Sequence, residues 1–377
     1  MQSIALKSHK NKDWVFLLLF FSPILGLAFL CYLYMGFSLL FSRVKNIKGK
    51  SRSILLFCIL FFVFYKYIQI GNFTYWFALV RFFFGWALVF VYFRKFPVNI
   101  SVNSVIMAFS IEVIVEFLLI NTILPTSFLF NYPKIDGIGN IGPFIRVYSI
   151  GSNSSISGTI LCMLLAYRES LNKRACDVKD IRVDILSTIC IIMFASGTTF
   201  YLFLIYLFYR FNFFKIRYLI LGIVMMYVLF LVVSRMSISD GGILSHMSYD
   251  YLEFLWNYKG MQIEDNLYEY KNMSKLFGYD YNGEIEPLTW GDFAILEYYI
   301  SFGLVGIVSL VAIICVNINK INFMPIFLGI LGSIHYGGIF SLPGQMIFVL
   351  SLLLNKKYIN GVHNKNVRTR LHSKYSN

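Results

Sequence analysis

Three charged residues of this chain stand where an apolar segment meets a polar loop: Arg146, Arg235 and Asp292. Arginine guanidinium groups pair with two phosphate oxygens at once. An aspartate within hydrogen-bond distance can accept a proton from a sugar hydroxyl. These residue types therefore predict a site for a diphosphate and a carbohydrate, with Arg146, Arg235 and Asp292 as its catalytic candidates. Simpler roles stay open, since Arg146 could anchor a helix at a membrane surface and Asp292 could cap one.

Other residues near these positions are candidates for substrate binding. Gly151 and Asn153 follow Arg146 at the predicted start of a helix, where exposed backbone N–H groups suit a phosphate. Trp290 offers an aromatic face to a sugar. His246 and His335 are further bases, although a lone histidine commonly has a structural hydrogen bond instead. No spacing typical of a metal site, a nucleotide-binding loop or a serine hydrolase is present, so we expect no metal and no cofactor.

Arg81, Glu112 and Glu116 lie inside apolar segments. Arg81 is about 12 Å from the predicted outer end of its segment, and the two glutamates, four residues apart, share one face of another helix. Charges at such depth require a partner or water. Either Arg81 pairs with one of the glutamates and fixes helix packing, or all three line a polar cavity that opens outward. In the second case Arg81 binds substrate.

The composition places these residues in a membrane protein. The mean hydropathy is +0.67, and 58% hydrophobic with 14% charged residues excludes an ordinary soluble domain. We predict a single all-α, polytopic membrane domain over residues 1–377. Its candidate spans are 14–41, 54–70, 73–93, 100–123, 150–167, 184–195, 199–211, 218–234, 293–316, 322–336 and 338–354.

The distribution of charge predicts the orientation. Basic clusters recur between alternate spans from residue 54 onward, which puts them and the basic tail 355–377 on the cytoplasmic side. The run 14–41 is either one long helix or two short ones separated at Pro23 and Gly26, giving eleven or twelve spans, of which we prefer twelve. The segments 184–195 and 199–211 are short, and short helices at membrane depth commonly face a cavity.

Two substantial loops are then extra-cytoplasmic, 124–149 and 235–292. The second is acidic although the chain has a net charge of +14. Its bases are Arg235, Lys259, Lys271 and Lys275, and its carboxylates are Asp240, Asp250, Glu253, Glu264, Asp265, Glu269, Asp280, Glu284, Glu286 and Asp292. This segment is long and polar enough to form a large external surface, so we expect it to contact the substrate.

Several of these features, in this order, resemble one family. They are Arg146 with Gly151, Asn153 and Gly158, the turn Ser196 to Thr199 between two short segments, Leu276 to Asp280, Trp290 to Asp292, and Tyr299 to Gly306. Together they cover about residues 140 to 310 and are similar to the Wzy-type O-antigen and capsular polysaccharide polymerases, which are related to the O-antigen ligases. The turn often reads Ser-Arg in that family, whereas residues 196–199 contain no arginine.

The resemblance implies a fold like that of the GT-C lipid-linked glycosyltransferases. It also implies a metal-independent transfer of a growing glycan from undecaprenyl diphosphate to another lipid-linked repeat unit, at the outer face of the bacterial inner membrane. The expected partners are that lipid-linked oligosaccharide, membrane lipids and a chain-length regulator protein, with no nucleic acid.

Other functions fit the sequence less well. A ligase typically has a histidine late in the large loop, where this chain has Asp292. A flippase for the lipid-linked unit should have short loops. A membrane O-acetyltransferase requires a histidine near a cytoplasmic acyl-donor site, and a purely structural scaffold does not require Arg81, Glu112 and Glu116 at membrane depth.

Overall fold

The structure, a computed structural model, describes residues 14–41, 65, 67–68, 73–98, 101–122, 144–175, 180–211, 253, 257, 260–261, 264, 275–278 and 294–354. All regular secondary structure in these ranges is helical, and they contain no strand, which confirms the predicted all-α class. The α-helices are α2 (Ala28–Phe41), α4 (Phe73–Lys95), α5 (Val102–Thr122), α6 (Ser154–Ala175), α7 (Ile181–Phe194), α8 (Gly197–Arg210), α11 (Ala294–Asn317), α12 (Phe323–His335) and α13 (Leu342–Leu353). Three short 3-10 helices join them: η1 (Ser22–Leu25), η3 (Ser149–Gly151) and η5 (Gly338–Phe340).

Two of these helices are long and apolar enough to cross a membrane. They are α5, with 21 residues, and α11, with 24. At 1.5 Å per residue each is at least about 30 Å long, the thickness of the hydrocarbon layer. Four further apolar helices are shorter: Trp14–Leu25, α2, α12 and α13. Most of the predicted spans 54–70 and 218–234, and most of the two predicted loops and the tail, lie outside the described residues.

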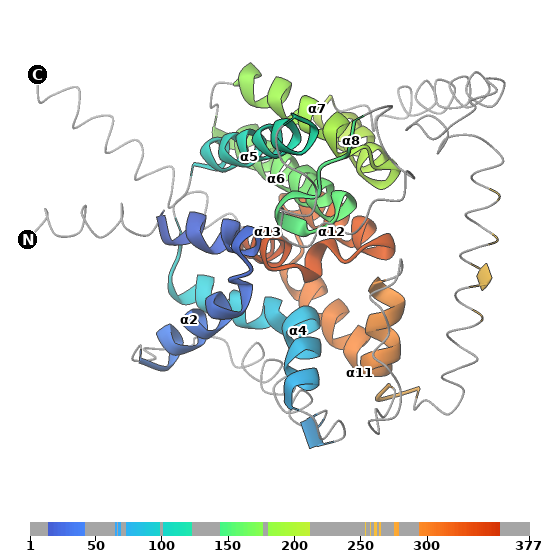
Figure 1. The fold of residues 1–377 in the computed structure, drawn as a ribbon. Helices are drawn as coiled ribbons and strands as arrows, with labels where there is room; N and C mark the ends of the chain where they lie inside the picture. The colour runs from blue at the N-terminus through green and yellow to red at the C-terminus, as the bar shows by residue number, and fades with distance from the viewer. Residues whose placement is uncertain are drawn as a thin grey trace, which may run out of the picture.

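Helices α12 and α13 lie between two groups, α5 to α8 on one side and α2, α4 and α11 on the other (Figure 1). Small residues bring α12 and α6 together in antiparallel directions. A Cβ at Gly332 would be 2.5 Å from the Thr159 side chain, and one at Gly329 would be 2.9 Å from Met163. Such close approach through glycines is typical of helices packed in a membrane, where hydrophobicity alone does not drive association.

The first apolar run is broken, as one of the two sequence interpretations proposed. Pro23 lies in the first turn of η1, and Gly26 closes it at φ +69°, a conformation that favours glycine. The run therefore forms two short helices, Trp14–Leu25 and α2. The predicted pair of short helices at 184–195 and 199–211 is confirmed as α7 and α8, separated by Ala195 at φ +45°.

Helix α11 contains a break that the sequence did not predict. Gly303 has φ +62° and ψ −163°. The next two N–H groups leave the helical pattern, with Leu304 donating to the Lys275 carbonyl and Val305 to the Leu276 carbonyl, each at 3.0 Å. A Cβ on Gly303 would be 2.5 Å from the Gly278 nitrogen. The segment 275–278 therefore packs backbone against backbone on this break, which only a glycine allows.

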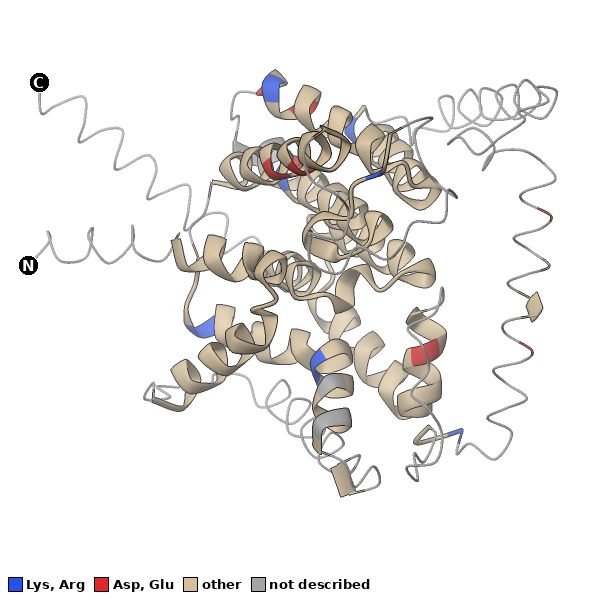
Figure 2. Cartoon of the chain, viewed as in Figure 1, with Lys and Arg blue, Asp and Glu red and all other residues tan. Residues whose placement is uncertain are grey.

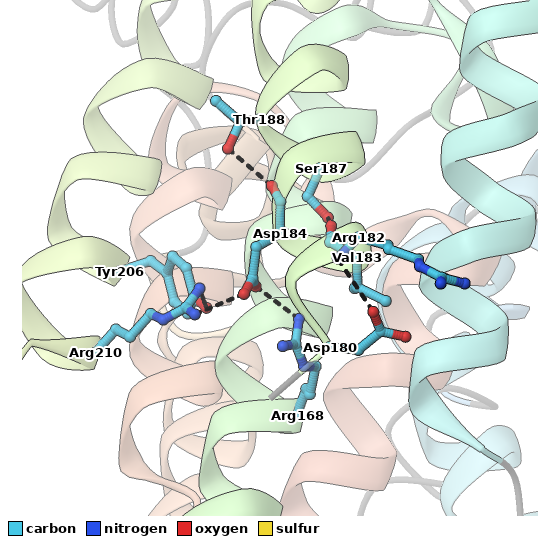
Figure 3. A network of polar contacts seen from close by, with 9 residues as sticks. All are labelled: Arg168, Asp180, Arg182, Val183, Asp184, Ser187, Thr188, Tyr206 and Arg210. Atoms are coloured by element: carbon cyan, nitrogen blue, oxygen red, sulfur yellow. Dashed lines mark hydrogen bonds and ion pairs between the residues drawn. The ribbon is translucent and has the colours of Figure 1, made fainter. Parts of the chain in front are cut away.

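Charged side chains are sparse in the described helices (Figure 2). An ion-pair network joins one end of three of them, with Asp184 of α7 contacting Arg168 of α6 at 2.9 Å and Arg210 of α8 at 2.6 Å (Figure 3). We call this the basic end. Helix α6 continues beyond the predicted end of the span at residue 167, to Ala175, and Arg168 is buried against Asp184.

Candidate functional site

The candidate site lies at the opposite end of α6 and α8, where residues 145–153 lead into α6. Helix α5 holds the start of this segment through Asn121. The Asn121 Oδ1 accepts from the Ile145 N–H at 2.7 Å, and its Nδ2 donates to the Ile145 carbonyl at 3.1 Å. One amide side chain therefore satisfies both backbone groups of the residue before Arg146.

Two glutamates of the same helix hold the segment after Arg146. The Glu116 Oε1 accepts the N–H groups of Tyr148 at 3.3 Å and of Ser149 at 3.0 Å. The Ser149 hydroxyl donates to Glu112. Ser149 has φ +53°, which is uncommon for a residue with a side chain and is stabilised here by these contacts.

The predicted pairing of Arg81 with these glutamates does not form. The ion pairs between the described residues are those of Arg168 and Arg210 with Asp184. Arg81 lies in α4, where its carbonyl accepts from Gln345 of α13 at 3.0 Å. Gln345 also donates to the carbonyls of Phe82 at 2.9 Å and Phe340 at 2.8 Å. Glu116 instead accepts backbone N–H groups and Glu112 accepts the Ser149 hydroxyl, so neither glutamate forms an ion pair with Arg81.

Arg146 is half-buried and has no carboxylate partner among the described residues. Its Cζ lies 5.4 Å from the centre of the Tyr148 ring, and its Nη2 is 3.5 Å from the Tyr148 hydroxyl, a long contact. Its Nε is buried without a hydrogen-bond partner. A guanidinium has five N–H donors, so most of the donors of Arg146 remain available to an anion.

Gly151 and Asn153 shape the turn that connects Arg146 to α6. The buried Gly151 donates its N–H to the Ser157 hydroxyl at 2.9 Å, and that hydroxyl donates to the Tyr148 carbonyl at 2.5 Å. Asn153 caps α6, since its Oδ1 accepts the Ser155 N–H at 2.8 Å. The N–H of Gly151 is thus used inside the turn, whereas the sequence interpretation had it facing a phosphate.

The starts of α6 and α8 meet beside this turn. The hydroxyls of Ser155 and Ser196 are 2.7 Å apart, and the Thr199 hydroxyl donates to the Ser154 carbonyl at 3.5 Å. Gly158 allows this approach, since a Cβ there would collide with the Thr199 side chain. Both helices direct the positive end of their dipole toward the same place, so the polar residues there lie in a field that favours an anion.

His335 joins the same cluster from the far end of the sequence. It is the last residue of α12, and its Nδ1 lies 3.0 Å from the Thr198 hydroxyl in the first turn of α8. Its ring meets the Tyr336 ring edge to face, with centres 4.1 Å apart. We call Ser154, Ser155, Ser196, Thr198, Thr199 and His335 the hydroxyl cluster. An imidazole hydrogen-bonded to a hydroxyl can donate or accept a proton, depending on its tautomer.

The segment that follows His335 lies against α4 and α11. A Cβ on Gly337 would be 2.8 Å from the Phe82 ring of α4 and 3.4 Å from Ala294, the first residue of α11. The predicted site residues Arg235, His246, Trp290 and Asp292 lie outside the described residues. Of the predicted set, the structure thus brings Arg146, Gly151, Asn153 and His335 to one end of the helix group, whereas Arg81 lies in α4 without an ion pair to Glu112 or Glu116.

Some residues of this site were not predicted as a group. Asn121 had no role in the sequence interpretation, Thr198 entered it only as part of the turn 196–199, and Glu112 and Glu116 had a different role. The available signal was the concentration of Ser, Thr and Asn at the starts of predicted helices, which is also the pattern of ordinary helix caps. Pairing across α5, α6, α8 and α12 depends on tertiary contacts that spacing does not encode.

Comparisons of the chain with models of protein families, with curated proteins and with solved structures found no match in any of the three.

Proposed function

We propose that this protein is a polysaccharide polymerase of the Wzy type. It would transfer a growing glycan from undecaprenyl diphosphate to another lipid-linked repeat unit at the outer face of the bacterial inner membrane. The observation that carries the proposal is Arg146, a half-buried guanidinium with no carboxylate partner among the described residues, at the end of the helix group where α6 and α8 begin.

The chemistry of the reaction fits this arrangement. When the bond between the sugar and the diphosphate breaks, negative charge develops on the leaving diphosphate. Fixed positive charge in a site of low dielectric constant stabilises that charge more than water does. Arg146 and the dipoles of α6 and α8 supply positive charge without a metal ion, and arginine matches the geometry of phosphate oxygens.

The hydroxyl cluster would serve the carbohydrate. Serine and threonine hydroxyls both donate and accept hydrogen bonds, as sugar hydroxyls do. His335 or Asp292 would accept the proton of the attacking sugar hydroxyl, with Arg235, His246 and Trp290 completing the site from the acidic loop. Gly151 and Asn153 would act by shaping the turn beside Arg146.

The charge distribution supports the proposed orientation. Arg168, Asp184 and Arg210 lie at the end opposite Arg146, and that end would face the cytoplasm by the excess of basic residues in its loops. Twelve spans, a GT-C-like arrangement and a cytoplasmic C-terminus complete the proposal, and the two membrane-length helices α5 and α11 are consistent with it.

Deletion of the gene, followed by electrophoresis of the surface polysaccharide, tests the function. A polymerase predicts that the ladder of chain lengths collapses to a single repeat unit and that the wild-type gene restores it. Loss of even the single unit would point to a flippase or a ligase. An unchanged ladder would exclude a role in surface glycans.

The assay can be repeated with purified components. The full-length protein in lipid nanodiscs would receive lipid-linked repeat units extracted from the deletion strain. Longer lipid-linked chains should form, with release of undecaprenyl diphosphate and with no effect of EDTA.

A further inference from the structure

Side chains of α5 hold the backbone on both sides of Arg146. Asn121 binds both backbone groups of Ile145, which precedes Arg146, and Glu116 accepts the N–H groups of Tyr148 and Ser149, which follow it. Glu112 adds a contact to the Ser149 hydroxyl. Residue 146 is therefore bracketed by side-chain hydrogen bonds from α5, and α7 adds one backbone bond, from the Val147 N–H to the Met193 carbonyl at 3.2 Å.

The two acids among these side chains require a structural reason. Glu112 and Glu116 are half-buried acids in a helix of membrane length, where an ionisable group is costly unless it has a definite partner. Among the described residues, Glu116 accepts two backbone N–H groups and Glu112 accepts the Ser149 hydroxyl.

The segment they hold departs from ordinary backbone geometry. Ser149 and Ser152 have φ values of +53° and +55°. Non-glycine residues rarely adopt this region, and each costs free energy that surrounding contacts must offset. Without its contacts to α5 the segment would relax, and Arg146, three residues from Ser149, would lose its fixed position.

We propose that Glu116, supported by Glu112 and Asn121, is a positioning residue that fixes Arg146 for the diphosphate. The role of Glu116 is that of a hydrogen-bond acceptor for two backbone N–H groups, and it does not require a negative charge. This inference rests on the proposed function for its ligand, while the contact itself can be tested without any substrate.

Substitutions at residue 116 separate the acceptor role from a charge role. In Glu116→Gln the amide oxygen still accepts both N–H groups, and only the charge of the side chain is removed. In Glu116→Ala both acceptors are lost. We expect Glu116→Gln to keep at least half of the polymerising activity per molecule and Glu116→Ala to lose at least tenfold.

The control is Thr122→Val on the same helix. Among the described residues its hydroxyl bonds to the Leu118 carbonyl of α5, so its loss leaves the contacts to residues 145–149 in place. We expect this variant to retain full activity and normal exchange. Equal losses in Glu116→Gln and Glu116→Ala would overturn the acceptor role.

A second measurement is independent of the substrate. Hydrogen exchange of the full-length protein in nanodiscs, followed by mass spectrometry, reports on the amides of Tyr148 and Ser149. We expect their exchange to become at least tenfold faster in Glu116→Ala and to remain unchanged in Glu116→Gln. Unchanged exchange in Glu116→Ala would refute the contact, whatever the protein proves to do.

A third comparison tests whether Glu116 acts through Arg146. If it does, adding Glu116→Ala to a chain that already carries Arg146→Ala should cause no further loss of activity. A full additional tenfold loss in the double variant would mean that Glu116 acts elsewhere. If the wild-type chain makes no polysaccharide while the exchange results hold, the proposed function fails and the positioning contact stands.

Discussion

The two ends of the α6, α7 and α8 group differ in how arginine is paired. At the basic end, Arg168 and Arg210 both bind the carboxylate of Asp184, so charge is balanced inside the protein. At the other end, the nearby carboxyl groups of Glu112 and Glu116 bind backbone and hydroxyl groups, and no described carboxylate binds Arg146. The first arrangement joins helices, whereas the second leaves a cation available to a ligand.

This contrast separates stability from activity. An ion pair that is largely shielded from water is costly to break, because its remaining partner keeps an uncompensated charge. An arginine without an ion-pair partner among the described residues should contribute less to folding, and under the proposed function its removal should affect the reaction instead. Substitutions at the basic end should therefore lower stability more than activity, and substitution of Arg146 should lower activity more than stability.

The largest effect on activity is expected from Arg146→Ala. Loss of one fixed electrostatic donor to a transition state typically lowers the rate by about 100-fold or more. Membrane abundance and melting temperature should stay close to wild type, because the guanidinium has no ion-pair partner among the described residues. Arg146→Lys should recover part of the activity, since lysine supplies the charge without the bidentate geometry.

The comparison variant is Arg168→Ala, measured by the same polymerisation assay and by thermal unfolding. It should lower stability and leave the activity of the folded fraction nearly unchanged. Normal stability of Arg168→Ala together with lost activity would show that the basic end, and not Arg146, is the functional one.

Asp184→Asn is expected to have the largest effect on stability. Asp184 is the shared partner of Arg168 and Arg210, and the side chains of the three residues are at most 17% exposed. Removing one member of such a network costs about 3 kcal/mol. The loss should be visible as a lower melting temperature in nanodiscs and a lower amount of protein in the membrane.

The matched control is Asp180→Asn, the same chemical change four residues earlier. Asp180 caps α7 by accepting the Arg182 N–H at 3.1 Å, and asparagine caps equally well. This variant should unfold at the wild-type temperature. Equal effects of the two substitutions would mean that the ion pairs do not hold the basic end together.

The elements were more predictable from the sequence than the site. Pro23 and Gly26 indicated the break in the first run, and the turn at Ser196 indicated two short helices, because proline, glycine and capping residues act locally. The break at Gly303 was missed, since it depends on the approach of residues 275–278. Tertiary contacts also decided the partner of Glu112, for which sequence depth left open an ion pair with Arg81 or a place in a polar cavity.

After Asp184→Asn, Gly303→Ala should cause the next largest loss of stability. A Cβ at this position would meet the Gly278 nitrogen and the Leu276 carbonyl, which are backbone atoms that cannot rotate away. The residue also has φ +62°, so strain adds to overpacking, for a cost of about 2 kcal/mol. Thermal unfolding should show the loss.

Gly36→Ala in α2 is the control for this substitution. A Cβ on Gly36 would have no neighbour within 4 Å, and alanine favours a helix over glycine. The melting temperature of this variant should equal or exceed that of the wild type. A Gly303→Ala protein as stable as Gly36→Ala would contradict the close packing of residues 275–278 on α11.

The smallest effect is expected from Thr198→Val, which keeps the shape of the side chain and removes the hydroxyl that bonds to His335. Loss of one such hydrogen bond costs about 1 kcal/mol, or roughly fivefold in rate if the bond orients the imidazole. Thr188→Val, which removes a hydroxyl bonded to the Asp184 carbonyl on α7, serves as the control.

The pH dependence of activity tests whether the His335 imidazole transfers a proton in the reaction. If it does, Thr198→Val should also shift the pH at which activity is half-maximal, whereas Thr188→Val should not. A uniform fall at every pH would limit His335 to a structural role and leave the choice of base to the residues of the acidic loop.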